Sequence, residues 1–243
     1  LIPVFRSTAQ VNLLRAKVPD KGIWVGVQPT DTDIPTVLAL FGRAVDELGE
    51  SLSTFELISA SAAERVEKHM HQTLPLRATH WLVLVEAAST SAHLSADFSD
   101  FMEKAFLDEL CEDGAIASNE AQRKAFWHLR ESLTEAEAAG GPSIKHDISV
   151  PVTRIPEFLD RADESLARYV AETGARLSPN VFGHVGDGNL HYNILTDRPD
   201  LAASLNRAVH DVVLSCGGSI TAEHGIGQYR LAEAYRLMPA AQL

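Results

Sequence analysis

The segment that most constrains the fold is Val181–Leu195, with the sequence VFGHVGDGNLHYNIL. Apolar and polar side chains alternate on both sides of Asp187 and Gly188, a dipeptide favoured in two-residue hairpin turns. The pattern therefore predicts an antiparallel β-hairpin with its turn at these two residues. In that register His184 and His191 lie directly opposite each other on neighbouring strands.

The two faces of this predicted hairpin differ in character. Asn189 and Asn193 would share the face that carries the histidines. The other face would be apolar, as a surface packed on a core requires, and would hold Val181, Val185, Leu190, Tyr192 and Ile194. A single register thus accounts for both faces.

A pair of opposed histidines can form a metal site. Directly opposed residues have Cβ atoms about 4.5–5.5 Å apart, which lets two imidazoles reach one divalent ion over bonds of about 2.0–2.1 Å. Glu223, in the glycine-rich segment Gly217–Gly227 (GGSITAEHGIG), could add a carboxylate. The alternatives are a hydrogen-bonded histidine pair on a strand and a solvated glutamate on a loop.

The remaining chain alternates short β-like runs with amphipathic helical patterns. Strands are predicted at 24–28, 55–59, 81–87 and near 116, and helices at 34–48, 62–71, 92–110, 120–137, 155–173 and 200–215. No glycine-rich phosphate loop follows the first strand, and the hairpin comes late. We therefore expect an α+β fold, with helices on one face of a largely antiparallel sheet, rather than a doubly wound parallel sheet. The best break between two halves is AAGGPS at 138–143.

Composition excludes several classes of protein. The formal net charge of −12 and the lack of basic runs argue against a nucleic-acid partner. The two cysteines, Cys111 and Cys216, are far apart, which favours buried free thiols over a disulfide or a cysteine zinc site. No apolar stretch has the length of a membrane span and no signal peptide is recognised, so a soluble cytoplasmic protein is expected. Since the chain does not start with methionine, a fragment is also expected.

Two long motifs, GHVGDGNLHYNI at Gly183–Ile194 and GGSITAEHGIG at Gly217–Gly227, resemble the C-terminal domain of FAD-linked oxidases of the vanillyl-alcohol-oxidase type. The likeness is greatest to the members that act as D-2-hydroxyglutarate or D-lactate dehydrogenases. It extends to WHLRESLTEA at Trp127–Ala136 and KHDISVP at Lys145–Pro151, and more loosely to STFELIS. After Gly227 it weakens.

This resemblance implies one ferredoxin-like α+β substrate (cap) domain over residues 1–243, which closes over a flavin held by a separate N-terminal domain that this chain lacks. It implies hydride transfer from a D-2-hydroxyacid to FAD. The partners would be the small hydroxyacid and, in the full-length enzyme, an electron-acceptor protein or quinone. A homodimer is a further expectation.

Position by position, the resemblance implies that His184, His191 and Glu223 bind a divalent ion, expected to be zinc. It implies that substrate is bound by Arg130, Thr134, Lys145, Asn193 and His224. We expect His224 to be the catalytic base, because an ordinary histidine pKa suits proton transfer near neutral pH.

The residues alone give these positions weaker support. Arg130 and Thr134 are four apart, so a helix presents them on one side, and a guanidinium can hold a carboxylate with two hydrogen bonds. The alternatives are a surface salt bridge between Arg130 and a nearby glutamate, a threonine bonded to its own backbone, and a solvated strand-edge lysine at Lys145. Two other functions stay open, a zinc-dependent hydrolase and a non-catalytic metal-binding module.

Overall fold

The computed structural model describes residues 22–28, 34–76, 80–223, 225–228 and 231–237. Its strands are β1 (Gly22–Gln28), β2 (Leu52–Ser59), β3 (Trp81–Ala88), β4 (Asp113–Ile116), β5 (Ser143–Ile144), β6 (Asp147–Ser149), β7 (Leu177–His184) and β8 (Asn189–Thr196). Its α-helices are α2 (Ile34–Leu48), α3 (Ala60–Met70), α4 (Leu94–Leu107), α5 (Glu120–Ala139), α6 (Ile155–Thr173), α7 (Ala202–Ser215) and α8 (Leu231–Leu237).

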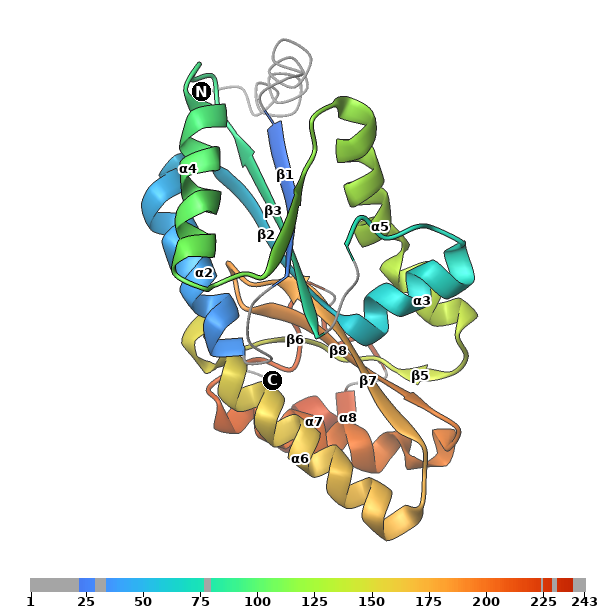
Figure 1. The fold of residues 1–243 in the computed structure, drawn as a ribbon. Coiled ribbons are helices and arrows are strands. Elements are labelled where there is room, and N and C mark those ends of the chain that lie inside the picture. Colours follow the sequence, from blue (N-terminus) through green and yellow to red (C-terminus); the bar gives the residue numbers. More distant parts are fainter. Residues whose placement is uncertain (1–21, 29–33, 77–79, 224, 229–230, 238–243) are drawn as a thin grey trace, which may run out of the picture.

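The strands form one antiparallel sheet in the order β4-β1-β3-β2-β7-β8-β5, with β6 also paired to β8 (Figure 1). The first four strands belong to the half of the chain before Gly140 and the others to the half after it. The two halves meet where β2 pairs with β7. The expected α+β class with an antiparallel sheet is confirmed, and the order β1, α2, β2, β3, α4, β4 is the βαββαβ order of ferredoxin-like units with α3 inserted.

Local sequence explains where several helices begin and end. In α2 the buried side chains recur every three or four residues, which places them on one side of the helix. Asn119 precedes α5, and its side chain accepts a hydrogen bond of 3.0 Å from the Gln122 N–H. Pro156 lies in the first turn of α6, and Gly174 ends that helix with a φ of 68°.

Helices cover both faces of the sheet. The larger core contains side chains from α2, α4, α6 and α7 on one face, and a smaller core contains α3 and α5 on the other. From the sequence, helices were expected on one face only. The difference arises in β2, where Phe55 and Leu57 join the larger core and Ile58 joins the smaller one, so both faces of this strand are buried.

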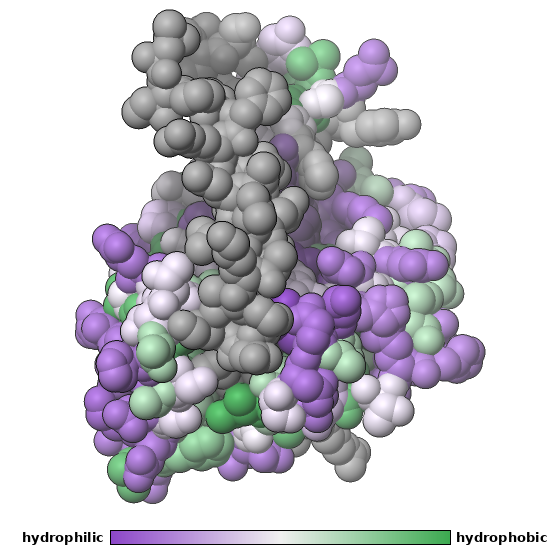
Figure 2. Space-filling view, turned by 90° about the horizontal axis from the view of Figure 1, so that it is seen from above, coloured by the Kyte–Doolittle hydropathy of each residue, from purple (hydrophilic) through white to green (hydrophobic). Residues whose placement is uncertain are grey.

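The surface at one end of the molecule is mainly hydrophilic. Figure 2 shows mainly hydrophilic residues on the coloured part of one end of the molecule, with hydrophobic residues scattered among them. Within the described residues, no helix is long and apolar enough to cross a membrane. Cys111 and Cys216 are free and buried, as predicted, and burial raises the pKa of the Cys111 thiol to about 12.

The predicted hairpin is present, but its register differs from the prediction. His184 pairs with Asn189, and His191 pairs with Phe182. The two histidines are therefore diagonal neighbours on one face instead of directly opposed residues. The apolar face is as predicted, since its five side chains are all buried.

The turn chemistry explains this error. The two-residue hairpin loops, of types I′ and II′, both need a positive φ at the first central residue, and Asp187 does not have one. Residues 185–188 instead form a four-residue turn, in which the Gly188 N–H donates to the Val185 carbonyl over 3.1 Å. The Asp187 carboxylate accepts from the Asn189 N–H at 3.0 Å and fixes the start of β8.

Gly188, in this turn, packs closely against neighbouring backbone, whereas Gly217, just after α7, does not. Gly188 and Gly217 have nearly equal φ angles, 72° and 75°, but a Cβ on Gly188 would lie 1.9 Å from the Val150 carbonyl oxygen, whereas one on Gly217 meets nothing within 4 Å. We expect Gly217→Ala to lower the free energy of unfolding by about 1 kcal/mol, from backbone strain alone, and Gly188→Ala by more than about 3 kcal/mol. Urea denaturation of both variants measures the difference, and equal losses would contradict the close packing.

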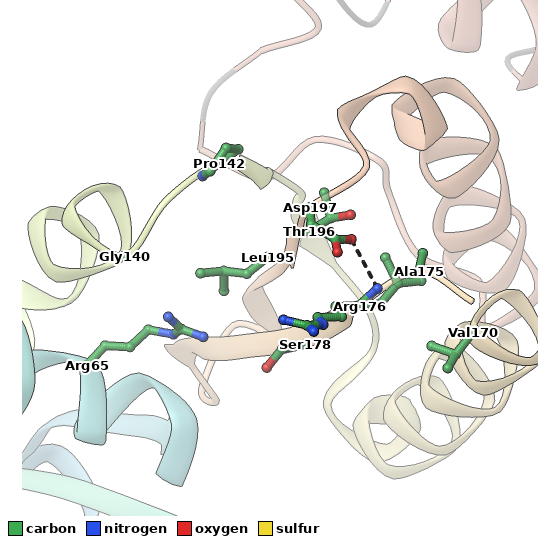
Figure 3. Close-up of a pocket in the computed structure, with 11 residues that line it drawn as sticks. Arg65, Gly140, Pro142, Val170, Ala175, Arg176, Ser178, Leu195, Thr196 and Asp197 are labelled. Atoms are coloured by element: carbon green, nitrogen blue, oxygen red, sulfur yellow. Dashed lines mark hydrogen bonds between the residues drawn. The ribbon is translucent and has the colours of Figure 1, made fainter. Parts of the chain in front are cut away.

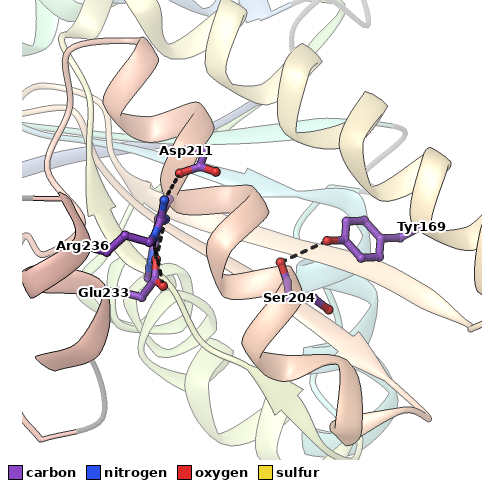
Figure 4. A network of polar contacts seen from close by, with 6 residues as sticks. Tyr169, Ser204, Asp211, Glu233 and Arg236 are labelled. Carbon is purple, nitrogen blue, oxygen red and sulfur yellow. Dashed lines mark hydrogen bonds and ion pairs between the residues drawn. The ribbon is translucent and has the colours of Figure 1, made fainter.

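A polar cluster attaches α8 to α7 (Figure 4). The Arg236 guanidinium lies 2.6 Å from Glu233 on its own helix and 2.7 Å from Asp211 on α7. Glu233 is also 3.3 Å from Nδ1 of His210, which is almost fully buried. Hydrogen bonding to Arg236 is the main reason why the pKa of Glu233 lies below its ordinary value of 4.5.

This cluster predicts acid-sensitive attachment of α8. Because the folded pKa of Glu233 is depressed, its contribution to stability is present above pH 4.5 and is lost as the pH falls through the folded value. Hydrogen exchange of the α8 amides, corrected for intrinsic rates, should accelerate as the pH falls below 4.5. In Glu233→Gln this pH dependence should be absent, and the same profile in both proteins would contradict the role of Glu233.

Candidate functional site

The candidate site is centred on Glu56, a fully buried carboxylate in the middle of β2. Its Oε1 lies 2.6 Å from Nδ1 of His184, the residue paired with it on β7. Its Oε2 accepts a hydrogen bond of 2.8 Å from Nε of Arg130 on α5. One acidic side chain thus holds two basic side chains that come from a helix and a strand far apart in the sequence.

The protonation of this trio follows from its contacts. Burial alone would raise the pKa of Glu56, but the hydrogen bond from His184 and the charge of Arg130 together lower it. The hydrogen bond to Glu56 raises the pKa of His184, against the opposite effect of desolvation. The Glu56 carboxylate is therefore ionised at neutral pH and keeps the imidazole Nδ1 as a proton donor.

The Phe182 ring contacts two side chains of this region, Arg130 and His191. The Arg130 guanidinium carbon lies 5.3 Å from its centroid, within the range of a cation–π contact. The ring centroid of His191 lies 4.8 Å from the same ring, with an angle of 32° between the planes. Phe182 therefore contacts both Arg130 and His191.

Glu223 approaches the site from the loop after α7. Its Oε1 is 3.7 Å from Nε2 of His184, and both side chains are partly exposed. The Glu223 N–H donates to the buried carboxylate of Asp147 on β6 over 3.1 Å, which fixes this part of the loop. His184 and Glu223, predicted from sequence to act together, are brought together.

The predicted metal site is only partly formed. His184 presents Nε2 to Glu223 while Nδ1 is tied to a carboxylate, which is the usual arrangement of a histidine that binds a metal. Within the described residues, however, no three His, Cys, Asp or Glu side chains gather closely enough to hold an ion. His191 pairs with Phe182 and does not complete the group.

A second buried carboxylate, Glu137 on α5, organises the neighbouring strands. It accepts hydrogen bonds from Asn193 at 2.7 Å, from Asn180 at 2.8 Å and from Ser143 at 2.6 Å. The Asn193 side chain also accepts from the backbone N–H of His146 at 3.0 Å. Asn193 is thus buried within a network that holds β7, β8 and the chain before β6 together.

Two of the other predicted substrate residues are exposed side chains. Thr134 is exposed on α5, one turn after Arg130. Lys145 is exposed as well, with its ammonium 3.9 Å from Glu137. His224 lies outside the described residues, so its predicted roles as base and substrate contact are not addressed by the structure.

The carboxylates that hold this site were not predicted from the sequence. Glu56, Glu137 and Asp147 are almost fully buried, and each binds a residue distant in sequence. A signal existed for Glu56, since an acidic residue inside the apolar run FELIS must have a partner when that strand is buried. Glu137 ends a helical pattern and resembles an ordinary surface glutamate.

A family model described as FAD linked oxidases, C-terminal domain, matches residues 32–241. The mitochondrial D-2-hydroxyglutarate dehydrogenases of Danio rerio and Rattus norvegicus are 35% and 33% identical to the chain, each over 79% of it. The match covers 36% and 35% of these relatives, so the chain spans about a third of their length. Among solved structures, an alkyldihydroxyacetonephosphate synthase shares the fold, with a TM-score of 0.55 at 9% identity, over 90% of this chain and 43% of that one.

These relatives correct one expectation from the sequence. Both are named as mitochondrial proteins, which contradicts the predicted cytoplasmic location. The prediction rested on the absence of a recognisable signal peptide, and such an absence does not distinguish among compartments inside the cell.

The contact between Arg130 and Glu56 predicts that this arginine also supports the fold. A surface arginine contributes little stability, but removing a partner of a buried carboxylate is costly. We expect Arg130→Ala to lower the free energy of unfolding by about 3 kcal/mol, and by about 1 kcal/mol or less when Glu56→Gln is already present. A double-mutant cycle in urea measures this coupling. Additive losses would show that the two side chains act independently.

Proposed function

Because the chain belongs to the family of FAD linked oxidases, C-terminal domain, we propose that it is the substrate-binding part of a flavin-dependent 2-hydroxyacid dehydrogenase. The proposed substrate is a D-2-hydroxyacid of the 2-hydroxyglutarate type, as the names of the relatives suggest. FAD would be held mainly by a part of the full-length protein outside this chain. An electron-acceptor protein or quinone would reoxidise the flavin.

The observation that carries the proposal is the pair of basic side chains fixed on buried Glu56. Arg130 and His184 are both oriented through one of their nitrogens and partly exposed, so their remaining N–H or nitrogen groups are available to a ligand. Because Glu56 and Phe182 hold these groups before substrate arrives, little ordering is needed on binding. A rigid basic surface of this kind suits a small carboxylate-bearing molecule on an otherwise acidic chain.

The side chains would divide the work as follows. Arg130, Thr134 and Lys145 would bind the substrate carboxylates, with Arg130 able to form two parallel hydrogen bonds. His224 would take the proton from the substrate hydroxyl as hydride leaves the α-carbon. Asn193 is held by Glu137 and by the His146 N–H, and its second amide N–H would make the proposed contact with the substrate.

The proposal also includes a divalent ion bound at the candidate site. His184 and Glu223 have suitable donor atoms and lie together, and His191 would have to approach them to complete the set. Such an ion would lower the pKa of a bound hydroxyl group and offset developing negative charge. The proposal for the hydroxyacid does not depend on it, since Arg130 and Lys145 supply positive charge without a metal.

Anaerobic reduction of the flavin in the full-length protein tests the function. D-2-hydroxyglutarate should bleach the flavin absorbance, and its L-enantiomer should not. D-lactate, mixed at the same concentration, reports whether the second carboxylate matters. An unreduced flavin with all three compounds would reject the proposal, and release of product from an ester or amide substrate by the metal-loaded protein would favour a hydrolase instead.

Glu223 and His224 should have separable roles. Consecutive side chains point in different directions, so one can face an ion while the other faces the substrate hydroxyl. In the full-length protein, Glu223→Gln should remove bound metal, as measured by elemental analysis. His224→Gln should retain it and slow flavin reduction by roughly 10²–10⁴-fold, as expected for loss of a general base. Equal loss of metal in both variants would place both residues at the ion.

A further inference from the structure

A pocket lies at the opposite end of β7 and β8 from the candidate site. It has a volume of about 610 Å³. Its polar wall contains Arg65 from α3, Arg176 just before β7 and Asp197 just after β8, and its apolar wall contains Val170, Leu177 and Leu195. Ser178 and His184 are six residues apart on β7, which separates the pocket from the candidate site by about 20 Å.

The two arginines of this pocket face each other. Figure 3 shows the guanidinium groups of Arg65 and Arg176 pointing toward one another across the pocket, with Ser178 beside Arg176. Among the residues that the structure describes, no carboxylate lies within ion-pair distance of either group, since the ion pairs of the chain involve other arginines. The Asp197 carboxylate in the pocket wall accepts a hydrogen bond of 3.1 Å from the Arg176 backbone N–H and forms no ion pair with either guanidinium group. Two like charges that face each other repel, so an anion between them would stabilise the arrangement.

Arg65 has a side-chain hydrogen-bond donor that no described residue accepts from. Its Nε is buried and has no hydrogen-bond partner within the described part of the chain. Burial lowers the pKa of Arg65, against the opposing charges of Glu137 and Glu64. A buried donor without an acceptor is costly, and an oxyanion at this position would supply the acceptor.

Gly140 allows the guanidinium to occupy this place. A Cβ at Gly140 would lie 2.9 Å from Nη1 of Arg65. Gly140 has ordinary helical φ and ψ angles of −78° and −10°, so its backbone conformation does not itself require glycine. The absence of a side chain leaves room for Arg65 beside the end of α5.

We propose that this pocket binds a small organic anion, with a carboxylate or phosphate between Arg65 and Arg176 and an apolar part against Val170, Leu177 and Leu195. A volume of this size accommodates a small ligand. Ser178 can add a hydroxyl hydrogen bond to the anion. This site is distinct from the proposed hydroxyacid site and shares no residue with it.

Calorimetric titration of the full-length, flavin-loaded protein tests the proposal. The probes are hexanoate, hexyl phosphate, inorganic phosphate and the uncharged hexanol. Hexanoate or hexyl phosphate should bind with a dissociation constant of about 1 mM or below, and hexanol should not. The stronger of the two alkyl anions identifies the preferred head group, and weaker binding of inorganic phosphate than of hexyl phosphate supports the apolar wall.

Three variants locate the binding. Arg65→Gln and Arg176→Gln should each weaken binding of the alkyl anions at least about tenfold. Arg168→Gln, which removes an exposed charge on α6 outside the pocket, should leave binding unchanged. Gly140→Ala should displace the Arg65 guanidinium and weaken binding with little change in thermal stability. Absence of binding, or equal weakening by Arg168→Gln, would overturn the proposal.

Discussion

The structure depends on how one buried negative charge is compensated. Glu56 is inside the sheet with no exposure to solvent, and an isolated carboxylate there would cost many kcal/mol. Its two partners come from different places, Arg130 from a helix of the first half of the chain and His184 from a strand of the second. The pairing of β2 with β7 is therefore required both by the backbone ladder and by the charge.

The buried carboxylate of Glu137 is also compensated by contacts between the two halves of the chain. Here the carboxylate again belongs to the first half, and its donors Asn180, Asn193 and Ser143 belong to the second. Each half supplies groups that would be unsatisfied alone. The polar face between the halves is consequently rigid, and a rigid polar face is what a site for a small charged substrate needs.

Much of the fold could be predicted from local pattern. The bounds of α2 and α6 agree with the predicted helices 34–48 and 155–173, because apolar periodicity, Pro156 and Gly174 are all local signals. The faces of the hairpin were predicted for the same reason. Its register was not, because a choice between two-residue and four-residue turns depends on whether Asp187 adopts a positive φ, which sequence leaves open.

The site was harder to predict than the fold. Arg130, His184 and Glu223 were found through their motifs, but what orients them lies elsewhere in the chain. The alternative considered for Arg130 was a salt bridge to a nearby glutamate, and the actual partner is 74 positions away. Contacts of that kind depend on which strands meet, and no local pattern of residues encodes that.

The close packing at the hairpin tip has a consequence for how this protein can change. Gly188 accepts a hydrogen bond from Val150, Ser149 is doubly bonded to Ser219, and four residues later comes Glu223. An inserted residue at the tip would shift β6 and, through it, the loop that carries Glu223. The hairpin tip and the Glu223 loop therefore form one mechanical unit, in which insertions and deletions in either loop are tolerated only when the other changes with it.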